Sequence, residues 1–154
     1  MNLDRIDLKI IRKLQDDGRM SNVQLADAVG LSASPCLSRV KRLEAAGIIL
    51  GYDTQFDLAK LGDFVSAYVQ VSMRSHRRDV AQRFEKYVAR IDEVVEFYMV
   101  NGKFDYVMKL VVEGYDGPAR VLEGMWQAKL GIESYSVFMV AATPIQHRPL
   151  PLGD

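Results

Sequence analysis

The chain has 154 residues, of which 49% are hydrophobic and 26% are charged, and its 20 basic side chains balance 20 acidic ones. This composition is typical of a globular chain of one domain or two small ones. It excludes intrinsic disorder, because enough apolar surface is available to form a core. A net charge of zero also excludes a uniformly basic nucleic-acid-binding chain, so any such binding must come from a local patch.

The sequence contains one cysteine, Cys36, and two histidines, His76 and His147. One cysteine cannot form an internal disulfide, and this set is too small for a zinc site built by the chain alone. No apolar run approaches the ~18 residues of a membrane span, and the N-terminal segment MNLDRIDLK lacks the apolar core of an export signal. The sequence therefore predicts no metal, no membrane partner and a reducing, cytoplasmic location.

The first fifty residues have the spacing of helices. Apolar residues at positions 6–14 repeat at helical intervals, and Gly18 follows where this first helix would end. Ser21 begins a second helix and forms a capping-box pattern with Gln24 three residues later. Gly30 suits the left-handed position that ends such a helix.

A third helix is expected to begin at Ser32 or Ser34, with Pro35 in its first turn, where a missing N–H costs little. Its predicted buried stripe consists of Leu37, Val40 and Leu43. Gly47 ends this helix. The β-branched and aromatic segment 48–52 then predicts a short strand.

The second half alternates between strand and helix patterns. Expected strands cover residues 64–73, 94–100, 105–113 and 134–142, and expected helices cover residues 79–90 and 118–130. The order strand–helix–strand occurs twice at an offset of about 41 residues, which predicts a βαββαβ sheet with both helices on one face. Residues 53–63 connect the two halves, and the tail from residue 143 carries three prolines and is expected to be extended.

The second and third helices are joined by a short turn at residues 30–32 and form a helix-turn-helix candidate. The polar side of the third helix presents Ser34, Ser38, Arg39, Lys41 and Arg42. Residues 33–46 hold three cationic side chains and one acidic one, a local net charge of +2, and Arg39 and Arg42 are spaced to point outward together.

Cations on this face can neutralise DNA phosphates, and arginine can pair with a guanine edge in the major groove. Ser21 and Asn22 lie at a helix N-terminus suited to a phosphate. A solvated basic face on a small helical bundle has the same pattern. The residues alone leave both interpretations open.

Longer motifs resemble a known family of transcription regulators. The patterns LDxxDxxI, DGRxSNxxLA and VGLSxSPCLxRVxRLExxGxI run through the first fifty residues, and VxGxFDYxxK covers residues 100–109. These motifs resemble the Lrp/AsnC family, the leucine-responsive/asparagine-type or "feast/famine" regulators. The resemblance covers nearly the whole chain and is weakest in the tail after residue 143.

The resemblance implies an α+β chain with a winged helix-turn-helix domain over residues 1–52, in which residues 51–52 belong to the wing. A linker over 53–63 then leads to a ferredoxin-like βαββαβ effector-binding and oligomerisation domain over 64–142, followed by a Pro-containing tail over 143–154. It also implies a homodimer whose sheets pack face to face, further assembly to an octamer, and double-stranded DNA as a partner.

Carried onto this chain, the resemblance places the helix that begins near Ala33 in the major groove. The candidate DNA-binding residues are Ser21, Asn22, Ser34, Ser38, Arg39, Lys41 and Arg42. Cys36 matches the family's SPC motif, and its place on an otherwise apolar turn favours packing over chemistry.

Asn101 and Gly102 lie between two apolar runs and predict a hairpin, because both residues tolerate a positive φ. The same loop exposes N–H groups that can hold a ligand carboxylate, and Asp105 can accept from a ligand ammonium group. These residues leave both interpretations open, whereas the resemblance implies a small effector beside this loop at a subunit boundary.

The candidate effector-binding residues are Met99, Asn101, Gly102, Phe104, Asp105, Phe138 and Met139. Aromatic and methionine side chains nearby slightly favour leucine or methionine over an acidic amino acid, with no other cofactor expected. The predicted function is thus a sequence-specific DNA-binding regulator that responds to a small amino acid.

Two other classes of protein compete with this prediction. An enzyme is not expected, because no nucleophile–base set, metal cluster or phosphate-cradling loop is visible in the sequence. An architectural protein that bends DNA without an effector would use the same helix and the same oligomer, and the sequence separates it poorly from a regulator. The effector, the operator and the choice between activation and repression are not determined by the sequence.

Overall fold

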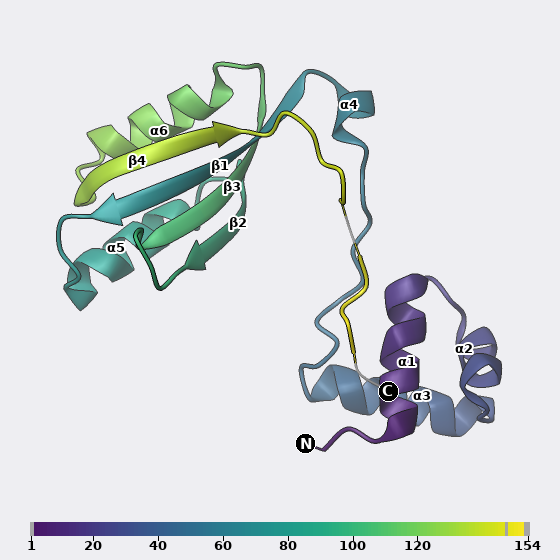
Figure 1. The fold of residues 1–154 in the computed structure, drawn as a ribbon. Coiled ribbons are helices and arrows are strands. Elements are labelled where there is room, and N and C mark those ends of the chain that lie inside the picture. Colours follow the sequence, from purple (N-terminus) through teal and green to yellow (C-terminus); the bar gives the residue numbers. More distant parts are fainter. Residues whose placement is uncertain (1, 147, 153–154) are drawn as a thin grey trace. The chain divides into compact units, whose positions relative to one another are not determined.

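The computed structural model describes residues 2–146 and 148–152, and the chain separates into two compact units (Figure 1). One unit contains the N-terminal residues up to Gln55 together with the tail that begins at Pro144, and the other is Phe56–Thr143. The first unit is helical and the second contains a four-stranded sheet, so the predicted α+β organisation is confirmed.

Three helices form the N-terminal unit: α1 Arg5–Asp16, α2 Asn22–Val29 and α3 Ala33–Ala45. The capping box predicted for the second helix is confirmed, since Ser21 Oγ accepts from the N–H of Gln24 and the Gln24 side chain accepts from the N–H of Ser21. Gly30 then ends α2 in the left-handed region, with a φ of 75°. Asp4 and Asp7 form a second capping box at the start of α1.

The core of this unit lies where the three helices meet. Its buried residues are Ile10, Leu25, Ala26, Val29, Cys36 and Leu43. The prediction that Leu37 is buried is wrong: Leu37 is 42% exposed, because Cys36 holds the inward position of that turn. Burial raises the pKa of the Cys36 thiol, as expected of a cysteine that packs in a core.

The strand predicted for residues 48–52 is not present. The N–H groups of Ile48 and Ile49 both donate to the carbonyl of Leu43, so they close the end of α3 and cannot pair with a strand. Gly47, just before them, has a φ of 67° and turns the chain away from the helix. The expected wing is therefore a loop in this structure, and Leu50 in it is 93% exposed.

The tail contacts α1 within the same unit. Gln15 Oε1 accepts from the N–H of Leu150 at 2.6 Å, and Arg12 Nη2 donates to the carbonyl of Leu152 at 2.9 Å. The described residues of the tail after position 143 contain no helix or strand, as the prolines predict.

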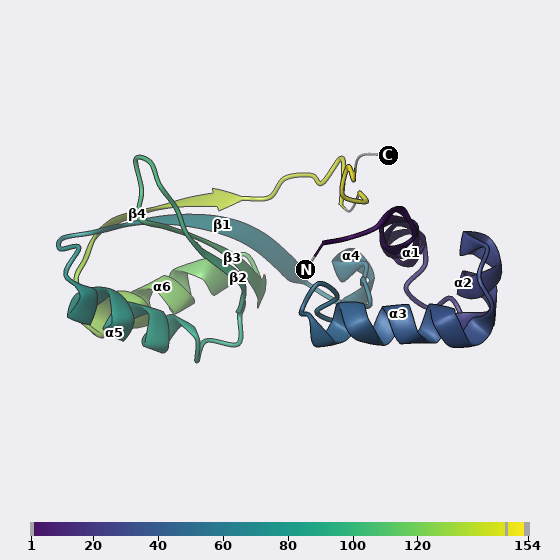
Figure 2. The same ribbon diagram turned by 90° about the horizontal axis from the view of Figure 1, so that it is seen from below.

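The second unit has the predicted strand and helix order. Its elements are a short helix α4 Leu58–Leu61, then β1 Phe64–Met73, α5 Arg78–Val88, β2 Val94–Met99, β3 Tyr106–Glu113, α6 Gly117–Gln127 and β4 Ile132–Met139. The strands pair antiparallel in the order β2-β3-β1-β4. Both long helices cover the same face of this sheet, as predicted (Figure 2). Only α4 has no counterpart among the predicted elements.

The sheet has one covered face and one open face. Alternate residues of β1 and β3 are buried against α5 and α6, among them Val69, Met108 and Leu110. The intervening residues lie on the open face, where Tyr68 pairs with Lys109 on one side and Phe138 on the other. Tyr68 and Phe138 are 40% and 52% exposed, so aromatic side chains lie on a surface that no part of this unit covers.

Candidate nucleic-acid and effector sites

The exposed side of α3 carries short polar residues and one lysine. Ser34, Ser38 and Lys41 lie on the side of the helix opposite Cys36 and Leu43, the residues that enter the core. Because small side chains allow close approach and Lys41 makes no ion pair with any described residue, this side is free to contact a nucleic-acid duplex. The helix-turn-helix therefore presents three of the predicted DNA-binding residues to solvent.

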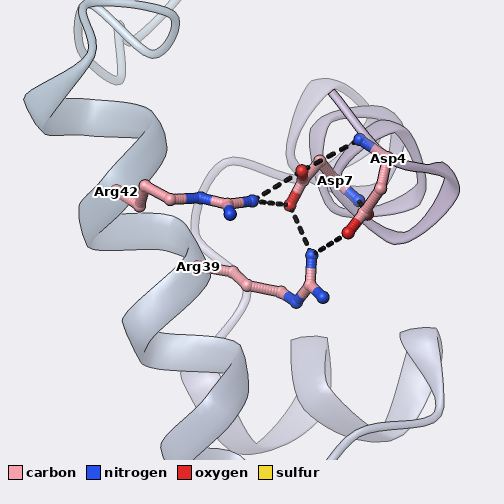
Figure 3. Close-up of polar contacts among 4 residues, drawn as sticks. All are labelled: Asp4, Asp7, Arg39 and Arg42. Carbon is pink, nitrogen blue, oxygen red and sulfur yellow. Dashed lines mark hydrogen bonds and ion pairs between the residues drawn. The ribbon is translucent and has the colours of Figure 1, made fainter. Parts of the chain in front are cut away.

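The prediction that Arg39 and Arg42 point outward together is wrong. Both guanidinium groups turn toward the start of α1 and bind the carboxylates of Asp4 and Asp7 (Figure 3). Arg42 Nη2 lies 2.7 and 2.6 Å from the two oxygens of Asp7. Arg39 Nη1 lies 2.8 Å from Asp7 Oδ1 and 2.6 Å from Asp4 Oδ2. The two arginines are spaced so that both reach the two acids, a pairing that was not predicted.

The two acids occupy different environments. The side chain of Asp7 is 1% exposed and that of Asp4 is 50% exposed. Arg39 and the N–H of Asp7 lower the pKa of the Asp4 carboxyl, and the two carboxylates raise the pKa of Arg39. Asp7 is thus a buried anion that requires its cations, whereas Asp4 is an exposed one.

This network changes the charge of the proposed DNA-binding face. The sequence segment 33–46 has a net charge of +2, but Asp4, the N-cap residue of α1, and Asp7 in α1 neutralise two of its three cations. The signal for this pairing is the pattern LDRID, in which two aspartates three residues apart begin a helix and form a capping box. Two outward-pointing cations that the sequence predicts are therefore held in ion pairs.

The remaining DNA-binding candidates lie at the start of α2. The side chain of Ser21 is occupied in the capping box, and Asn22 Nδ2 donates to the carbonyl of Ala33 at 2.8 Å. This bond ties the start of α2 to the start of α3, so Asn22 fixes the angle at which the two helices meet. The first N–H groups of α2 are on the surface beside it.

The loop between β2 and β3 is a hairpin, but its geometry differs from the one predicted. Neither Asn101 nor Gly102 has a positive φ. The connection spans residues 100–105 and is closed by a bond from the N–H of Val100 to the carbonyl of Asp105, at 2.9 Å. A six-residue loop spreads the turn over more residues, so it does not need the left-handed pair that a two-residue turn requires.

Asp105 connects this loop to the end of β1. Its N–H donates to the carbonyl of Val71, and its Oδ2 accepts from the N–H of Met73 at 2.7 Å. The register of β1 against β4 shifts between Ser72 and Met73, which frees the Met73 N–H for this bond. Asp105 Oδ1 lies 3.2 Å from Nδ1 of the exposed His76.

A pocket of about 180 Å³ opens beside this aspartate. It is lined by Met73, Ser75, His76, Ala81, Met99, Val100, Asn101, Asp105 and Tyr106. Three predicted effector-binding residues, Met99, Asn101 and Asp105, therefore lie together. The lining residues from β1, α5 and the loop between them were not among the predicted ones, because only the sheet order brings these segments beside the hairpin.

Tyr106 forms the inner wall of this pocket. Burial, followed by the hydrogen bond that its hydroxyl donates to Glu85 at 3.0 Å, raises the pKa of Tyr106 to about 12. Its ring packs against Phe84 and Phe97, with ring centroids 4.9 and 5.2 Å away. The pocket thus combines an aromatic and methionine wall with one carboxylate, an amide and an imidazole.

The other predicted effector-binding residues do not line this pocket. Gly102 and Phe104 lie in the same loop but are not among the residues that line the pocket. Phe138 and Met139 lie on β4 and pair with Tyr68 and Ala67, toward the opposite end of β1 from Met73. Within one chain their partners on β1 lie five and six residues before Met73, so about half the length of the strand separates them from the pocket.

A second hollow, of about 440 Å³, lies on the helix-covered side of the sheet. Its polar lining includes Glu93, Glu113 and Arg120, and it contains none of the predicted effector-binding residues. Arg120 already donates to the carbonyl of Glu113 and pairs with Asp116. Among residues 2–146 and 148–152, no cluster of three histidine, cysteine or acidic side chains is arranged to hold a metal, and no helix is long and apolar enough to cross a membrane.

Two sequence families match this chain. A family described as "Winged helix-turn-helix DNA-binding" matches residues 3–49, and one described as "Lrp/AsnC ligand binding domain" matches residues 66–150. The first match includes α1, α2 and α3. The second includes the sheet and the hairpin pocket.

Individual proteins match over most of the chain. The transcriptional regulatory protein DoeX of Halomonas elongata is 38% identical over 143 residues, which cover 93% of this chain and 90% of that protein. The leucine-responsive regulatory protein of Escherichia coli K12 is 42% identical over 108 residues, which cover 70% of this chain and 66% of that protein. A transcriptional regulator of Neisseria meningitidis, solved as a complex with L-Met, superposes with a TM-score of 0.87 at 28% identity and covers 97% of each chain.

Proposed function

Because the chain belongs to the Lrp/AsnC family of DNA-binding transcription regulators, we propose that an amino acid bound in the hairpin pocket controls how α3 engages DNA. The family match makes the chain a regulator with a ligand-binding domain and not an enzyme. We assign DNA binding to residues 1–52 and effector binding to residues 64–142. Its DNA partner makes the cytoplasm the expected location.

The observation that carries the proposal is the pocket beside Asp105. The ammonium group of an amino acid can bind the carboxylate of Asp105, and its carboxylate can bind N–H donors of the loop at Asn101. Both partners lie on one wall of the pocket. Its volume of about 180 Å³ is below the ~300–1,000 Å³ of pockets for drug-sized ligands, so a small ligand suits it.

Leucine and methionine are the effectors that we propose. Met73, Met99 and Ala81 line the pocket with flexible or small apolar groups, which accommodate an aliphatic or thioether side chain. The Neisseria meningitidis regulator was solved with L-Met, and the Escherichia coli relative is named for its response to leucine. An acidic side chain would meet the carboxylate of Asp105, and the lining contains no lysine or arginine to pair with it.

We propose that the chain acts as a homo-oligomer. The open face of the sheet exposes Tyr68, Tyr98 and Phe138, which a second sheet packed face to face would cover. Phe138 lies on this open face and would reach an effector only from a neighbouring copy, which agrees with its distance from the pocket of its own chain. Met139 pairs with the buried Ala67, so it lies on the helix-covered side of the sheet. Light scattering of the purified protein is expected to give a dimer or a multiple of it.

Thermal unfolding across the twenty amino acids tests the effector. A ligand at a hundredfold excess over its Kd adds about 2.7 kcal/mol to the free energy of unfolding. We expect methionine or leucine to stabilise the protein clearly. Asn101→Ala should lower the affinity for that amino acid about tenfold, because one charge-assisted hydrogen bond is lost. Lys103→Ala, in the same loop but outside the lining, is the matched control.

A second measurement separates the regulator from an architectural protein that bends DNA without an effector. Binding to genomic fragments is measured at fixed salt with and without the stabilising amino acid. A change of severalfold in affinity or in the spacing of bound sites supports the proposal, since allosteric coupling is typically worth ~1–3 kcal/mol. An unchanged DNA affinity and no stabilisation by any amino acid would establish the architectural alternative instead.

A further inference from the structure

The contact between Asp4 and Arg39 places an exposed anion on a cation of the helix that we propose reads DNA. Arg39 Nη1 bridges two carboxylates, the buried Asp7 and the exposed Asp4. A DNA phosphate is also an oxyanion, and it binds guanidinium groups through the same N–H donors. Asp4 therefore occupies a position at Arg39 that a phosphate could occupy (Figure 3).

The two acids are not equivalent in this respect. Asp7 is out of reach of a phosphate, since its side chain is 1% exposed and holds both arginines. Asp4 is half exposed, and ion pairs at exposed positions contribute little net stability. Asp4 can therefore leave Arg39, while Asp7 keeps the guanidinium in place.

Release of Asp4 from Arg39 does not disrupt α1. One oxygen of the carboxylate, Oδ1, accepts from the N–H of Asp7 and caps the helix, whereas the other, Oδ2, pairs with Arg39. The two contacts use different atoms, so the cap remains when the ion pair opens. Arg39 also has donors that no described residue uses, because a single nitrogen makes both of its bonds.

We propose that Asp4 competes with DNA phosphates for Arg39 and thereby weakens the binding of this chain to DNA of any sequence. A phosphate that displaces it gains one cation contact but remains close to the displaced carboxylate, within the ~8–10 Å range of charge interactions at physiological salt. Contacts from the solvent side of α3 to base edges are not affected by this competition. Because phosphate contacts carry no sequence information, the competition lowers the affinity for an operator and for random-sequence DNA alike.

This inference rests on the proposed function, in which α3 faces DNA. The test uses the full-length protein and a fluorescein-labelled random-sequence duplex, with anisotropy measured between about 50 and 200 mM salt. Asp4→Asn removes the charge and keeps a good N-cap residue, so the helix is expected to fold as before. Asp16→Asn, at the exposed end of α1, makes the same change in net charge at a residue that forms no ion pair with any described residue, and it is the control.

We expect Asp4→Asn to bind random DNA about three- to tenfold more tightly than the wild type near 0.1 M salt. The slope of log K against log salt should steepen by about 0.9 for each DNA-binding domain that contacts the duplex, because one more phosphate is neutralised. Asp16→Asn should change the affinity less than about twofold and leave the slope unaltered. Equal behaviour of the two variants, or weaker binding by Asp4→Asn, would overturn the inference.

Two further variants locate the effect. When Arg39→Gln is also present, Asp4→Asn should raise the affinity for random DNA no more than Asp16→Asn does, because the cation for which Asp4 and a phosphate compete is gone. A larger rise in affinity would overturn the inference. Lys41→Gln tests the proposed DNA face itself and should weaken binding and flatten the salt slope. If Lys41→Gln has no effect, the proposed face is wrong and the inference falls with it. If Lys41→Gln weakens DNA binding but Asp4→Asn does not strengthen it, the proposed DNA-binding face is supported and only this inference is wrong.

Discussion

The carboxylate of Asp105 accepts a hydrogen bond from the backbone N–H of Met73, with Oδ2 and the nitrogen 2.7 Å apart. This bond holds the end of β1 against the hairpin loop and shapes the wall of the effector pocket. Asp105 thus has a structural role in the free protein, in addition to the ligand contact that we propose for it.

The first prediction separates these two roles. Asp105→Ala leaves the buried N–H of Met73 without its acceptor and should lower the free energy of unfolding by about 1–3 kcal/mol. Asp105→Asn retains an acceptor oxygen and should lose about 1 kcal/mol or less, while losing the charge that would bind an ammonium group. Urea unfolding gives the stabilities. Equal stability of the two variants would contradict a structural role for this bond.

The second prediction concerns the buried carboxylate of the helical unit. Asp7→Ala leaves Arg39 and Arg42 without the anion that holds them to α1. We expect a loss of about 2–4 kcal/mol, near the lower end of the range for broken buried ion pairs because both arginines reach solvent. The measurement is hydrogen exchange of the α1 and α3 amides.

Asp57→Ala is a matched control, since its ion pair with Lys60 lies on an exposed surface and should contribute less than about 1 kcal/mol. It also caps the short helix α4, so any loss should appear in the amides of that helix and not in those of α3. Unchanged protection of α3 in Asp7→Ala would show that the ion pairs do not hold this helix.

The third prediction is a loss of stability at alkaline pH. The pKa of Tyr106 is about 12 in the folded chain and about 10 when the chain is unfolded, so the folded state favours the neutral phenol. Its stabilising contribution is fully present below pH ~10 and disappears as the pH rises through about 12. Two pKa units correspond to about 2–3 kcal/mol of unfolding free energy.

Tyr106→Phe isolates this contribution from other groups that titrate in the same range. The variant loses the hydrogen bond to Glu85 and should be less stable at neutral pH, but its stability should fall less steeply between pH ~10 and 12. Urea unfolding of both proteins across this range gives the difference. Parallel pH profiles would show that Tyr106 does not keep a raised pKa in the folded chain.

Elements whose formation depends on nearby residues were predictable from the sequence. The bounds of β1 agree with the predicted strand because its alternation of buried and exposed residues begins and ends with the strand. Ser21 and Gln24 formed the expected capping box, since both partners lie within one turn.

Features that depend on segments distant in sequence were not predictable in this way. The spacing of Arg39 and Arg42 shows that they share a face, but not that Asp4 and Asp7 lie opposite that face. The segment 48–52 has the composition of a strand, yet its amides close α3 and it has no partner strand in the described part of its unit. The pocket likewise could not be predicted without the order of the strands in the sheet, which brings Met73 beside Asp105.

The fourth prediction concerns Cys36, which the sequence interpreted as a packing residue. Its side chain is fully buried and burial raises the pKa of its thiol, so both access and thiolate formation are suppressed in the folded chain. We expect an aromatic disulfide reagent to label Cys36 only at the rate at which the helical unit opens. Cys36→Ser should cost about 1–3 kcal/mol by burying a hydroxyl among apolar residues, whereas Cys36→Ala should cost less than Cys36→Ser. Rapid labelling under native conditions, at a rate independent of added denaturant, would show instead that this thiol is accessible and available for chemistry.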